Sequence, residues 1–367
     1  MRVGIDARLL AYGHGGIARY VEELTSAIAH RHTNVDLRIL RSRKDPTSHH
    51  DRVARLWTPP HHRFEHVTLP LELAVQRLDI VHSPDHVAPL PLGYHTVVSV
   101  HDLAFLLFPD THTEESRRYY QQMQASLDRA ARIITVSQQT RSDLLAHTPV
   151  DPSRVTTIYN GIHPRFHPRP DGVVTPEEHL VLDRFGLPEG YMLTVGTISP
   201  RKNLMTLLDA LARLRPRHRS LHLAVVGEHG WLTQPTLDRI RTLGLQRTVH
   251  LLGGVDEADL VTLYRSARLF VYPSLYEGFA FPPLEAMACG TPVVTSSSGS
   301  IPEVTGDAAI LVDSRDAGRL AWEIEETLAN RERRQQLRER GLQRARLFTW
   351  ERCAQETVAV YRAVAEG

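Results

Sequence analysis

The chain has 367 residues, which is enough for two domains of ordinary size and excludes a single small binding module. Lys and Arg number 43 and Asp and Glu 42, so the formal net charge is +1 and nucleic acid is not expected as a partner. No run of 18 apolar residues is present, and charged Asp6 and Arg8 interrupt the N-terminal apolar stretch, so we expect a cytoplasmic protein without a signal peptide.

Short apolar runs alternate with longer segments of helical period, as in βα units that build a parallel sheet. In the first half, residues 16–30 repeat apolar side chains at intervals of three and four, which predicts a helix with one apolar face. The predicted strands of this half are residues 2–6, 35–40, 78–82, 96–101, 132–137 and 155–159.

Residues 160–178 break this alternation. They carry four prolines, which interrupt helices and favour extended chain, so we predict a linker between two domains. A second series of predicted strands follows at residues 191–195, 221–226, 248–252, 269–272, 292–295 and 309–312.

This pattern predicts two Rossmann-like, doubly wound α/β domains, residues 1–168 and 169–347, that face each other across a cleft. The amphipathic segment 348–367 is expected to form a helix that packs back across the hinge. Ligands of such sheets bind at the carboxyl ends of the strands, so the loops that follow the predicted strands are where functional residues are sought.

The first such loop carries Gly13, Gly15 and Gly16, directly before the helix at 16–30. Glycines let a ligand approach the backbone closely, and the amides at a helix N-terminus attract an anion. Phosphate binding and a simple turn are the two interpretations of this loop.

The second loop is GTISPRKN at 196–203, where a strand end is followed by Gly196 and then by the adjacent cations Arg201 and Lys202. A guanidinium fork beside a compact ammonium suits the two phosphates of a diphosphate, and the helix that follows adds partial positive charge. A solvated surface pair is the alternative.

The third loop is EGFAFPPLE at 277–285, after the predicted strand 269–272. Glu277 lies in the loop, and Glu285 lies eight residues on, inside a helix that two prolines open. This spacing lets Glu277 and the amides around Phe279, Ala280 and Phe281 face one part of a ligand while Glu285 faces another. Two solvated acids are the alternative.

Taken in order, these motifs resemble the retaining glycosyltransferases of family 4, which have the two-domain GT-B fold. The resemblance covers essentially the whole chain. It rests on the Glu-x7-Glu pattern from Glu277 to Glu285, the GTISPRKN stretch, the NGI segment at 160–162 and the terminal FTWERCAQETVAVYR segment.

The resemblance implies transfer of a hexosyl group from a nucleotide diphosphate sugar with retention of the anomeric configuration. In such enzymes the positions of Arg201 and Lys202 bind the donor diphosphate, that of Glu285 binds the ribose, and that of Glu277 binds the sugar hydroxyls. No metal or other cofactor is expected, because two cations and helix amides can neutralise the diphosphate.

The donor-binding set implied by the resemblance also includes Gly15, Gly16, Gly196, Phe279, Ala280 and Phe281. Ala280 departs from the glycine that is usual in the family, which leaves the contacts to the sugar open.

The segment VSVHDLAFLLFPD places His101 at the end of a predicted strand, with Asp102 next to it. His101 resembles the family's cleft histidine, which implies a role in positioning the transition state, against the alternative of a satisfied strand-end histidine. Asp102 is a candidate for orienting the acceptor or His101. The apolar residues 103–108 belong either to the core or to a contact with a lipid tail of the acceptor.

Similar stretches occur in mannosyl- and rhamnosyl-type members that build bacterial surface polysaccharides. The resemblance therefore implies GDP-mannose as the donor, a glycan or lipid-linked acceptor, and peripheral contact with the inner face of the membrane.

Two other classes stay open. An NADP-type oxidoreductase is favoured by Gly13-x-Gly15-x-x-Ala18 and by Arg41 and Arg43, although these glycines come later than in the dinucleotide fingerprint. A non-catalytic sugar-nucleotide-binding subunit is the second.

A metal site is not indicated by the sequence. His82 and His86 are four residues apart, but Pro84 between them breaks a shared helical face. Cys289 and Cys353 are far apart and form no metal-binding or disulfide pattern.

Overall fold

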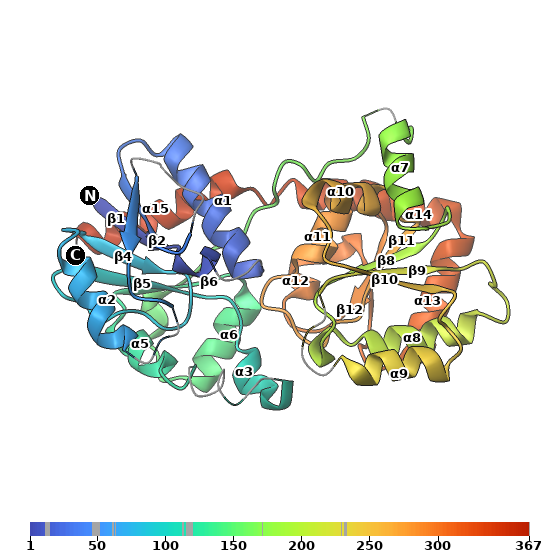
Figure 1. Cartoon of the computed structure of the whole chain (residues 1–367), viewed down its shortest axis with the longest axis horizontal. Coiled ribbons are helices and arrows are strands. Elements are labelled where there is room, and N and C mark those ends of the chain that lie inside the picture. Colours follow the sequence, from blue (N-terminus) through green and yellow to red (C-terminus); the bar gives the residue numbers. More distant parts are fainter. Residues whose placement is uncertain are drawn as a thin grey trace. The chain divides into compact units, whose positions relative to one another are not determined.

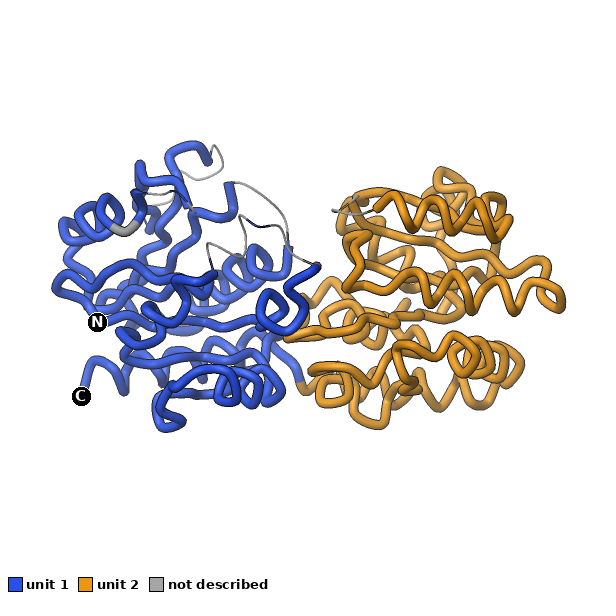
Figure 2. The backbone as a smooth tube through the Cα atoms, turned by 90° about the horizontal axis from the view of Figure 1, so that it is seen from below, with its two compact units in different colours: residues 1–161, 348–367 blue, residues 162–347 orange. Residues whose placement is uncertain are grey.

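The structure is a computed structural model that describes residues 1–11, 15–45, 52–60, 62, 64–111, 114, 120–170, 172–228, 230 and 233–366. The chain divides into two compact units, residues 1–161 with 348–367 and residues 162–347 (Figures 1 and 2). Each unit has its own parallel sheet covered by helices, which confirms the predicted pair of doubly wound α/β domains.

The first unit contains a seven-stranded sheet in the order β3-β2-β1-β4-β5-β6-β7, with every pairing parallel. Its strands are β1 (Arg2–Asp6), β2 (Asp36–Ser42), β3 (Val53–Leu56), β4 (Ile80–Ser83), β5 (His95–Val100), β6 (Arg132–Thr135) and β7 (Val155–Thr157). Its helices are α1 (Gly16–Arg31), α2 (Glu65–Ala74), α3 (Ala104–Leu107), α5 (Met123–Arg129), α6 (Gln138–His147) and α15 (Trp350–Glu366), with 3-10 turns η1 (Arg8–Ala11), η2 (Pro109–Thr111) and η3 (Pro152–Arg154).

The second unit contains a six-stranded parallel sheet in the order β10-β9-β8-β11-β12-β13. Its strands are β8 (Met192–Val195), β9 (Leu223–Val226), β10 (Val249–Gly253), β11 (Leu269–Tyr272), β12 (Val293–Ser296) and β13 (Ile310–Val312). Its helices are α7 (Pro176–Arg184), α8 (Leu204–Leu214), α9 (Gln234–Thr242), α10 (Glu257–Ser266), α11 (Phe281–Ala288), α12 (Ile301–Thr305), α13 (Ala317–Ala329) and α14 (Arg331–Ala345), with 3-10 turns η4 (Pro200–Lys202) and η5 (Gly306–Ala308).

All twelve predicted strands are present, with ends that differ by at most two residues, because buried parallel strands produce continuous apolar runs. The strand that the sequence analysis missed is β3, at the edge of the first sheet. It is short and only half-buried, and the exposed Arg55 interrupts its apolar pattern.

The boundary between the units lies between Gly161 and Ile162, seven residues before the predicted boundary at 168/169. Residues 162–168 contact the second unit, where Phe166 is buried and meets the ring of Tyr264 edge-on at 5.9 Å. Helix α7 also begins inside the predicted linker, because Thr175 and Glu178 form a capping box at its N-terminus.

The C-terminal segment returns to the first unit, where α15 lies against α1 and β4 (Figure 1). Gly161 allows this return, since a Cβ atom there would lie 2.2 Å from the backbone nitrogen of Trp350. A chain of buried hydrogen bonds holds the helix, from Tyr361 Oη to His82 Nδ1 (2.5 Å) and from His82 Nε2 to Ser99 Oγ (2.8 Å).

Acid is expected to weaken this anchor of α15. Burial lowers the pKa of His82 to about 3 in the folded chain. In the unfolded chain the same imidazole has its ordinary pKa near 6.5, so between these values only the unfolded chain is protonated there. Stability from neutral His82 is present above pH 6.5 and is lost as the pH falls, by about 1.4 kcal/mol per unit. Between pH 7.5 and pH 5, the free energy of unfolding measured in urea should fall by about 2 kcal/mol more for the wild type than for His82→Gln. Equal losses would contradict this role.

Candidate active site

The candidate site of the second unit lies where the order of the sheet reverses, between β8 and β11. The loop after β8 carries Arg201 and Lys202 in η4, and the loop after β11 carries Glu277. Open α/β sheets bind ligands at such a reversal, because the two loops diverge there and leave room at the carboxyl edge.

These three charged side chains are in direct contact. Glu277 Oε1 accepts hydrogen bonds from Lys202 Nζ (2.6 Å), Tyr272 Oη (2.7 Å) and Ser274 Oγ (2.6 Å). Glu277 Oε2 accepts one from Arg201 Nη1 (2.9 Å), which also donates to the carbonyl of Tyr276 (2.7 Å). The carboxylate therefore fixes both cations.

Charge and burial set the protonation of this cluster. Burial raises the pKa of Glu277, but the charges of Arg201 and Lys202 and the donated hydrogen bonds outweigh it and bring the pKa to about 2. Burial raises the pKa of Tyr272 well above its ordinary value, with the Glu277 charge adding to the effect, so its hydroxyl remains a donor. Two cations and one carboxylate leave a net charge of +1, which favours an anionic ligand.

Two glycines make room for the cluster. Gly196 has φ +148°, and a Cβ there would lie 3.4 to 3.7 Å from the Lys202 side chain, which packs along the glycine. Gly299 has φ +58°, and a Cβ there would lie 2.7 Å from the carbonyl oxygen and 2.8 Å from the nitrogen of Glu277. Gly299 thus lets the loop after β12 approach the Glu277 backbone, and Ser300 N donates to the Glu277 carbonyl (3.0 Å).

Glu285 lies on α11. It is 1% exposed and accepts a hydrogen bond from the hydroxyl of Tyr264 (2.8 Å), which fixes its orientation. Phe279, Ala280 and Phe281 are all buried at the start of α11. Ala280 has φ −86°, which any side chain permits, so the backbone does not require the glycine that is usual in the family.

The predicted phosphate loop of the first unit is described only in part. Gly15 is the exposed N-cap of α1 and Gly16 is its first residue, and a Cβ at Gly15 would meet nothing within 4 Å. Among the described residues, nothing therefore crowds Gly15 at the α1 N-terminus; Gly13 lies outside them.

His101 directly follows β5, and its Nε2 donates to the carbonyl of Pro84 (2.8 Å). Burial, with the charge of His86 adding to it, lowers the pKa of His101 to about 4, so the ring is neutral. A carbonyl can only accept, so the proton is on Nε2 and Nδ1 carries the lone pair. Asp102 Oδ1 accepts a hydrogen bond from the backbone amide of Ala104 (3.0 Å).

His86 supports this turn, a role that its spacing from His82 in the sequence does not indicate. Its Nδ1 lies 2.8 Å from Asp85 Oδ1, and its Nε2 lies 2.6 Å from the carbonyl oxygen of Asp102. Burial lowers the pKa of His86, but the hydrogen bond and charge of Asp85 outweigh it and raise the pKa above its ordinary value. An acceptor at each nitrogen favours the charged, doubly protonated ring.

The apolar residues 103–108 belong mainly to the core. Leu103, Ala104 and Phe105 are buried, and only Leu106 of this run is clearly exposed. Of the two interpretations given to this run, the structure favours the core for its first three residues.

The sequence analysis also missed Tyr272, Ser274 and Gly299 in the second unit. Tyr272 ends a buried strand and resembles any core residue, while Ser274 lies in a short connection with no motif. Gly299 within the run SSSGS at 296–300 was the one available signal, since glycine among small polar residues indicates a tight turn.

Within the described part of the chain, no three His, Cys, Asp or Glu side chains gather as metal ligands would. Nor does any helix described there have both the length and the apolar character to cross a membrane.

Comparison with known proteins identifies the family. Residues 14–166 match the family described as Glycosyltransferase Family 4, and residues 184–344 match the one described as Glycosyl transferases group 1. The chain is 35% identical over 286 residues to the O-antigen chain mannosyltransferase B of Escherichia coli, a match that covers 77% of this chain and 74% of that protein.

Solved structures share the fold over nearly the whole chain. The sucrose-phosphate synthase of Thermosynechococcus elongatus superposes with a TM-score of 0.81 at 22% identity, covering 99% of this chain and 98% of that one. Anabaena Alr3699/HepE, solved with UDP-glucose, gives a TM-score of 0.77 at 17% identity, covering 99% and 100%. The GT-B fold is therefore confirmed, and the chain belongs to glycosyltransferase family 4.

Proposed function

We propose that this glycosyltransferase moves mannose from GDP-mannose, with retention of configuration, to a glycan or lipid-linked acceptor during assembly of a surface polysaccharide. The observation that carries the proposal is the Arg201–Lys202–Glu277 cluster, which has a net positive charge at the reversal of the second sheet. The similarity to an O-antigen chain mannosyltransferase supports mannose and a polysaccharide acceptor.

In this proposal, Arg201 and Lys202 bind the donor diphosphate and stabilise the charge that develops on the leaving nucleotide. Glu285 receives the ribose hydroxyls, and Glu277 contacts the sugar while holding the two cations in place. The α1 N-terminus at Gly15 and Gly16 contacts a phosphate. His101 positions the donor sugar through its Nδ1 lone pair. A metal is not required, because the cations supply the positive charge.

Retention, with the leaving phosphate as the base, is what the resemblance to family 4 implies. The Glu277 cluster is compatible with it, because Glu277 is held by four donors and has a pKa of about 2, which makes it a poor base. As the bond from the anomeric carbon to the phosphate oxygen breaks, the acceptor hydroxyl forms its bond on the same face and gives its proton to that phosphate.

A thermal-shift panel of GDP, UDP, ADP, dTDP and NADP and their common sugar conjugates, GDP-mannose among them, with EDTA and then with magnesium, tests the proposal. A nucleotide at one hundred times its dissociation constant stabilises the fold by about 2.7 kcal/mol. We expect GDP and GDP-mannose to raise the melting temperature most, and equally in EDTA.

Two results would overturn parts of this. A shift with NADP alone would favour the oxidoreductase alternative, although Arg41 pairs with Asp45 (2.6 Å) and Arg43 stacks on Trp57 (3.5 Å). If GDP raises the melting temperature but no GDP is released from GDP-mannose in the presence of an acceptor glycan, the alternative of a non-catalytic sugar-nucleotide-binding subunit is favoured.

A further inference from the structure

Two histidines hold together the loops that follow β4 and β5 in the first unit. The strands are parallel neighbours, so both loops leave the carboxyl edge of the sheet side by side. His101 Nε2 donates to the carbonyl of Pro84 (2.8 Å), and His86 Nε2 donates to the carbonyl of Asp102 (2.6 Å). Each loop therefore supplies one imidazole and one carbonyl, and the two hydrogen bonds fix one loop to the other.

His86 carries the positive charge at this junction. Its Nδ1 donates to Asp85 Oδ1 (2.8 Å), so both ring nitrogens donate and the imidazole is doubly protonated. The same Oδ1 accepts from the backbone amide of His86 (2.7 Å), which fixes the carboxylate against the ring. Asp85 and His86, here called the dyad, are 4% and 3% exposed.

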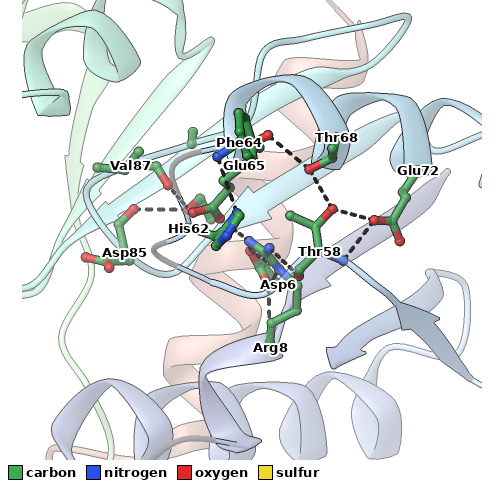
Figure 3. Close-up of polar contacts among 12 residues, drawn as sticks. Asp6, Arg8, Thr58, His62, Phe64, Glu65, Thr68, Glu72, Asp85 and Val87 are labelled. Atoms are coloured by element: carbon green, nitrogen blue, oxygen red, sulfur yellow. Dashed lines mark hydrogen bonds and ion pairs between the residues drawn. The ribbon is translucent and has the colours of Figure 1, made fainter. Parts of the chain in front are cut away.

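The surroundings fix the orientation of the dyad. Ser83 Oγ donates to the carbonyls of Asp85 (3.1 Å) and Val87 (3.0 Å) and closes the turn after β4 (Figure 3). The rings of Phe105 and Tyr120 meet the imidazole of the dyad edge-on, with centroids at 5.5 and 5.1 Å. Hydrogen bonds and aromatic packing together therefore prevent the imidazole from turning away.

Stability alone does not explain a buried ion pair in this place. Removing two charges from water offsets much of their attraction, and apolar side chains of the same size often stabilise a fold as well. The charge does change the neighbouring imidazole. Burial, with the charge of His86 adding to it, lowers the pKa of His101 to about 4 and keeps that ring neutral, with a lone pair on Nδ1.

The other described groups that face His101 do not supply a second positive charge. Tyr20 of α1 meets its ring edge-on at 4.8 Å, and burial raises the pKa of that phenol, so it is neutral. Burial lowers the pKa of His82 in β4 to about 3, so it is neutral as well. The acids Asp85 and Asp102 act in the opposite direction and raise the pKa of His101. The charged imidazole of the dyad therefore opposes these two acids.

We propose that Asp85 and His86 are positioning residues for sugar transfer, which hold His101 in place and neutral so that its Nδ1 accepts a hydroxyl of the donor sugar. This role rests on the proposed contact between His101 and the donor. His101 is half-buried, and no described residue forms a hydrogen bond with its Nδ1, so the lone pair is available to a ligand. Protonation of His101 would place a hydrogen on Nδ1 and abolish this acceptance.

Histidine NMR tests the effect of the dyad in the absence of any donor. The full chain is labelled with ¹³C at histidine Cε1 and titrated between about pH 5 and pH 8, and the variants His101→Ala and His86→Gln assign the two signals by their loss. In the wild type the His101 signal should stay constant, because its pKa is about 4. In His86→Gln its midpoint should rise by about one to two pH units, because the cation is gone while Asp85 remains. His82→Gln, which removes a buried neutral imidazole from β4, is the matched control and should leave the signal constant.

Asp85→Asn separates charge from packing, because the side chain keeps its shape. In the wild type the carboxylate raises the pKa of His86 above its ordinary value. Without this charge, burial dominates, and the His86 midpoint should fall below that of an ordinary histidine. This variant decides the question if circular dichroism shows that His86→Gln does not fold. A His86 signal that titrates as in the wild type would then overturn the proposal.

Transfer rates test whether the dyad acts through His101. GDP release from GDP-mannose with an acceptor glycan should be about 10- to 100-fold slower in His86→Gln at pH 8, where His101 is neutral but less firmly held. The loss should deepen towards pH 6, because His101 becomes protonated there. Adding His86→Gln to His101→Ala should slow transfer no further, since the group that the dyad positions is already gone.

The outcomes separate this proposal from the proposed function. An unchanged His101 midpoint in His86→Gln, or a loss of rate that does not depend on pH, would overturn it. If the midpoints shift as expected but His101→Ala transfers as fast as the wild type, the contact with the donor sugar is wrong and the positioning role falls with it. A wrong donor base shows itself separately, because the thermal-shift panel then responds to a nucleotide other than GDP, and the rates are measured with that sugar nucleotide.

Discussion

Lys202→Ala is expected to lower the rate of sugar transfer by about 10²- to 10³-fold. The ammonium is the donor closest to Glu277 Oε1 among the charged groups, at 2.6 Å, and its side chain packs along Gly196 with 17% exposure. The ammonium interacts more strongly with the leaving diphosphate in the transition state, where negative charge develops, than with the intact donor. Binding of GDP should weaken by about ten- to a hundredfold, the value of one charge-assisted hydrogen bond.

Isothermal titration with GDP and initial rates of GDP release measure these two effects separately. Arg241→Ala is the matched control, since Arg241 is an exposed cation of the same unit that pairs only at the surface with Asp238 (3.0 Å). An unchanged rate in Lys202→Ala would remove this lysine from the site. A fall in GDP affinity without a larger fall in rate would limit its role to binding.

The sheets and the order of the charged motifs could be predicted from the sequence because both are local signals. Buried parallel strands are continuous apolar runs, and the loops that follow them carry Arg201, Lys202 and Glu277. The prediction that these residues share one site rested on a resemblance to a family. The structure adds the physical reason, which is the reversal of strand order between β8 and β11.

The partners of these residues could not be predicted, because they depend on which segments pack together. Tyr272 and Ser274 donate to Glu277 from the end of β11, and Gly299 reaches its backbone from the loop after β12. A tyrosine in an apolar strand has the same pattern whether its hydroxyl meets a carboxylate or solvent. Only the register of the strands separates the two cases.

Helix α2 illustrates a second limit. Periodicity locates an apolar face, but α2 has two of them, and the pattern alone does not say which is buried. In the folded protein Leu69 and Leu73 are buried, and Arg8 of η1, which precedes Glu65 by 57 residues, binds that carboxylate (Figure 3). The exposure of the other face, with Val67 and Leu71, is therefore a property of the tertiary structure that the sequence shows only as an apolar helix.

Glu277→Gln is expected to separate the two duties of this side chain. We expect transfer to fall by about 10²- to 10³-fold while GDP binds as well as before or more tightly. The amide has one oxygen, which can still accept from Lys202, Tyr272 and Ser274. In the wild type, Arg201 Nη1 donates to Glu277 Oε2 at 2.9 Å. In the variant the NH₂ group takes the place of that oxygen, so two donors face each other. Arg201 loses its carboxylate partner but keeps the carbonyl of Tyr276, and the net charge of the cluster rises from +1 to +2.

Comparison with Arg201→Ala/Lys202→Ala then decides how Glu277 acts. If Glu277 only holds the cations, adding Glu277→Gln to that double variant should not slow transfer further, because both groups that Glu277 positions are already gone. If Glu277 also contacts the sugar, the two losses should multiply. A drop in GDP affinity in Glu277→Gln as large as its drop in rate would contradict a sugar contact, because GDP carries no sugar at the reacting end and should not respond to its loss.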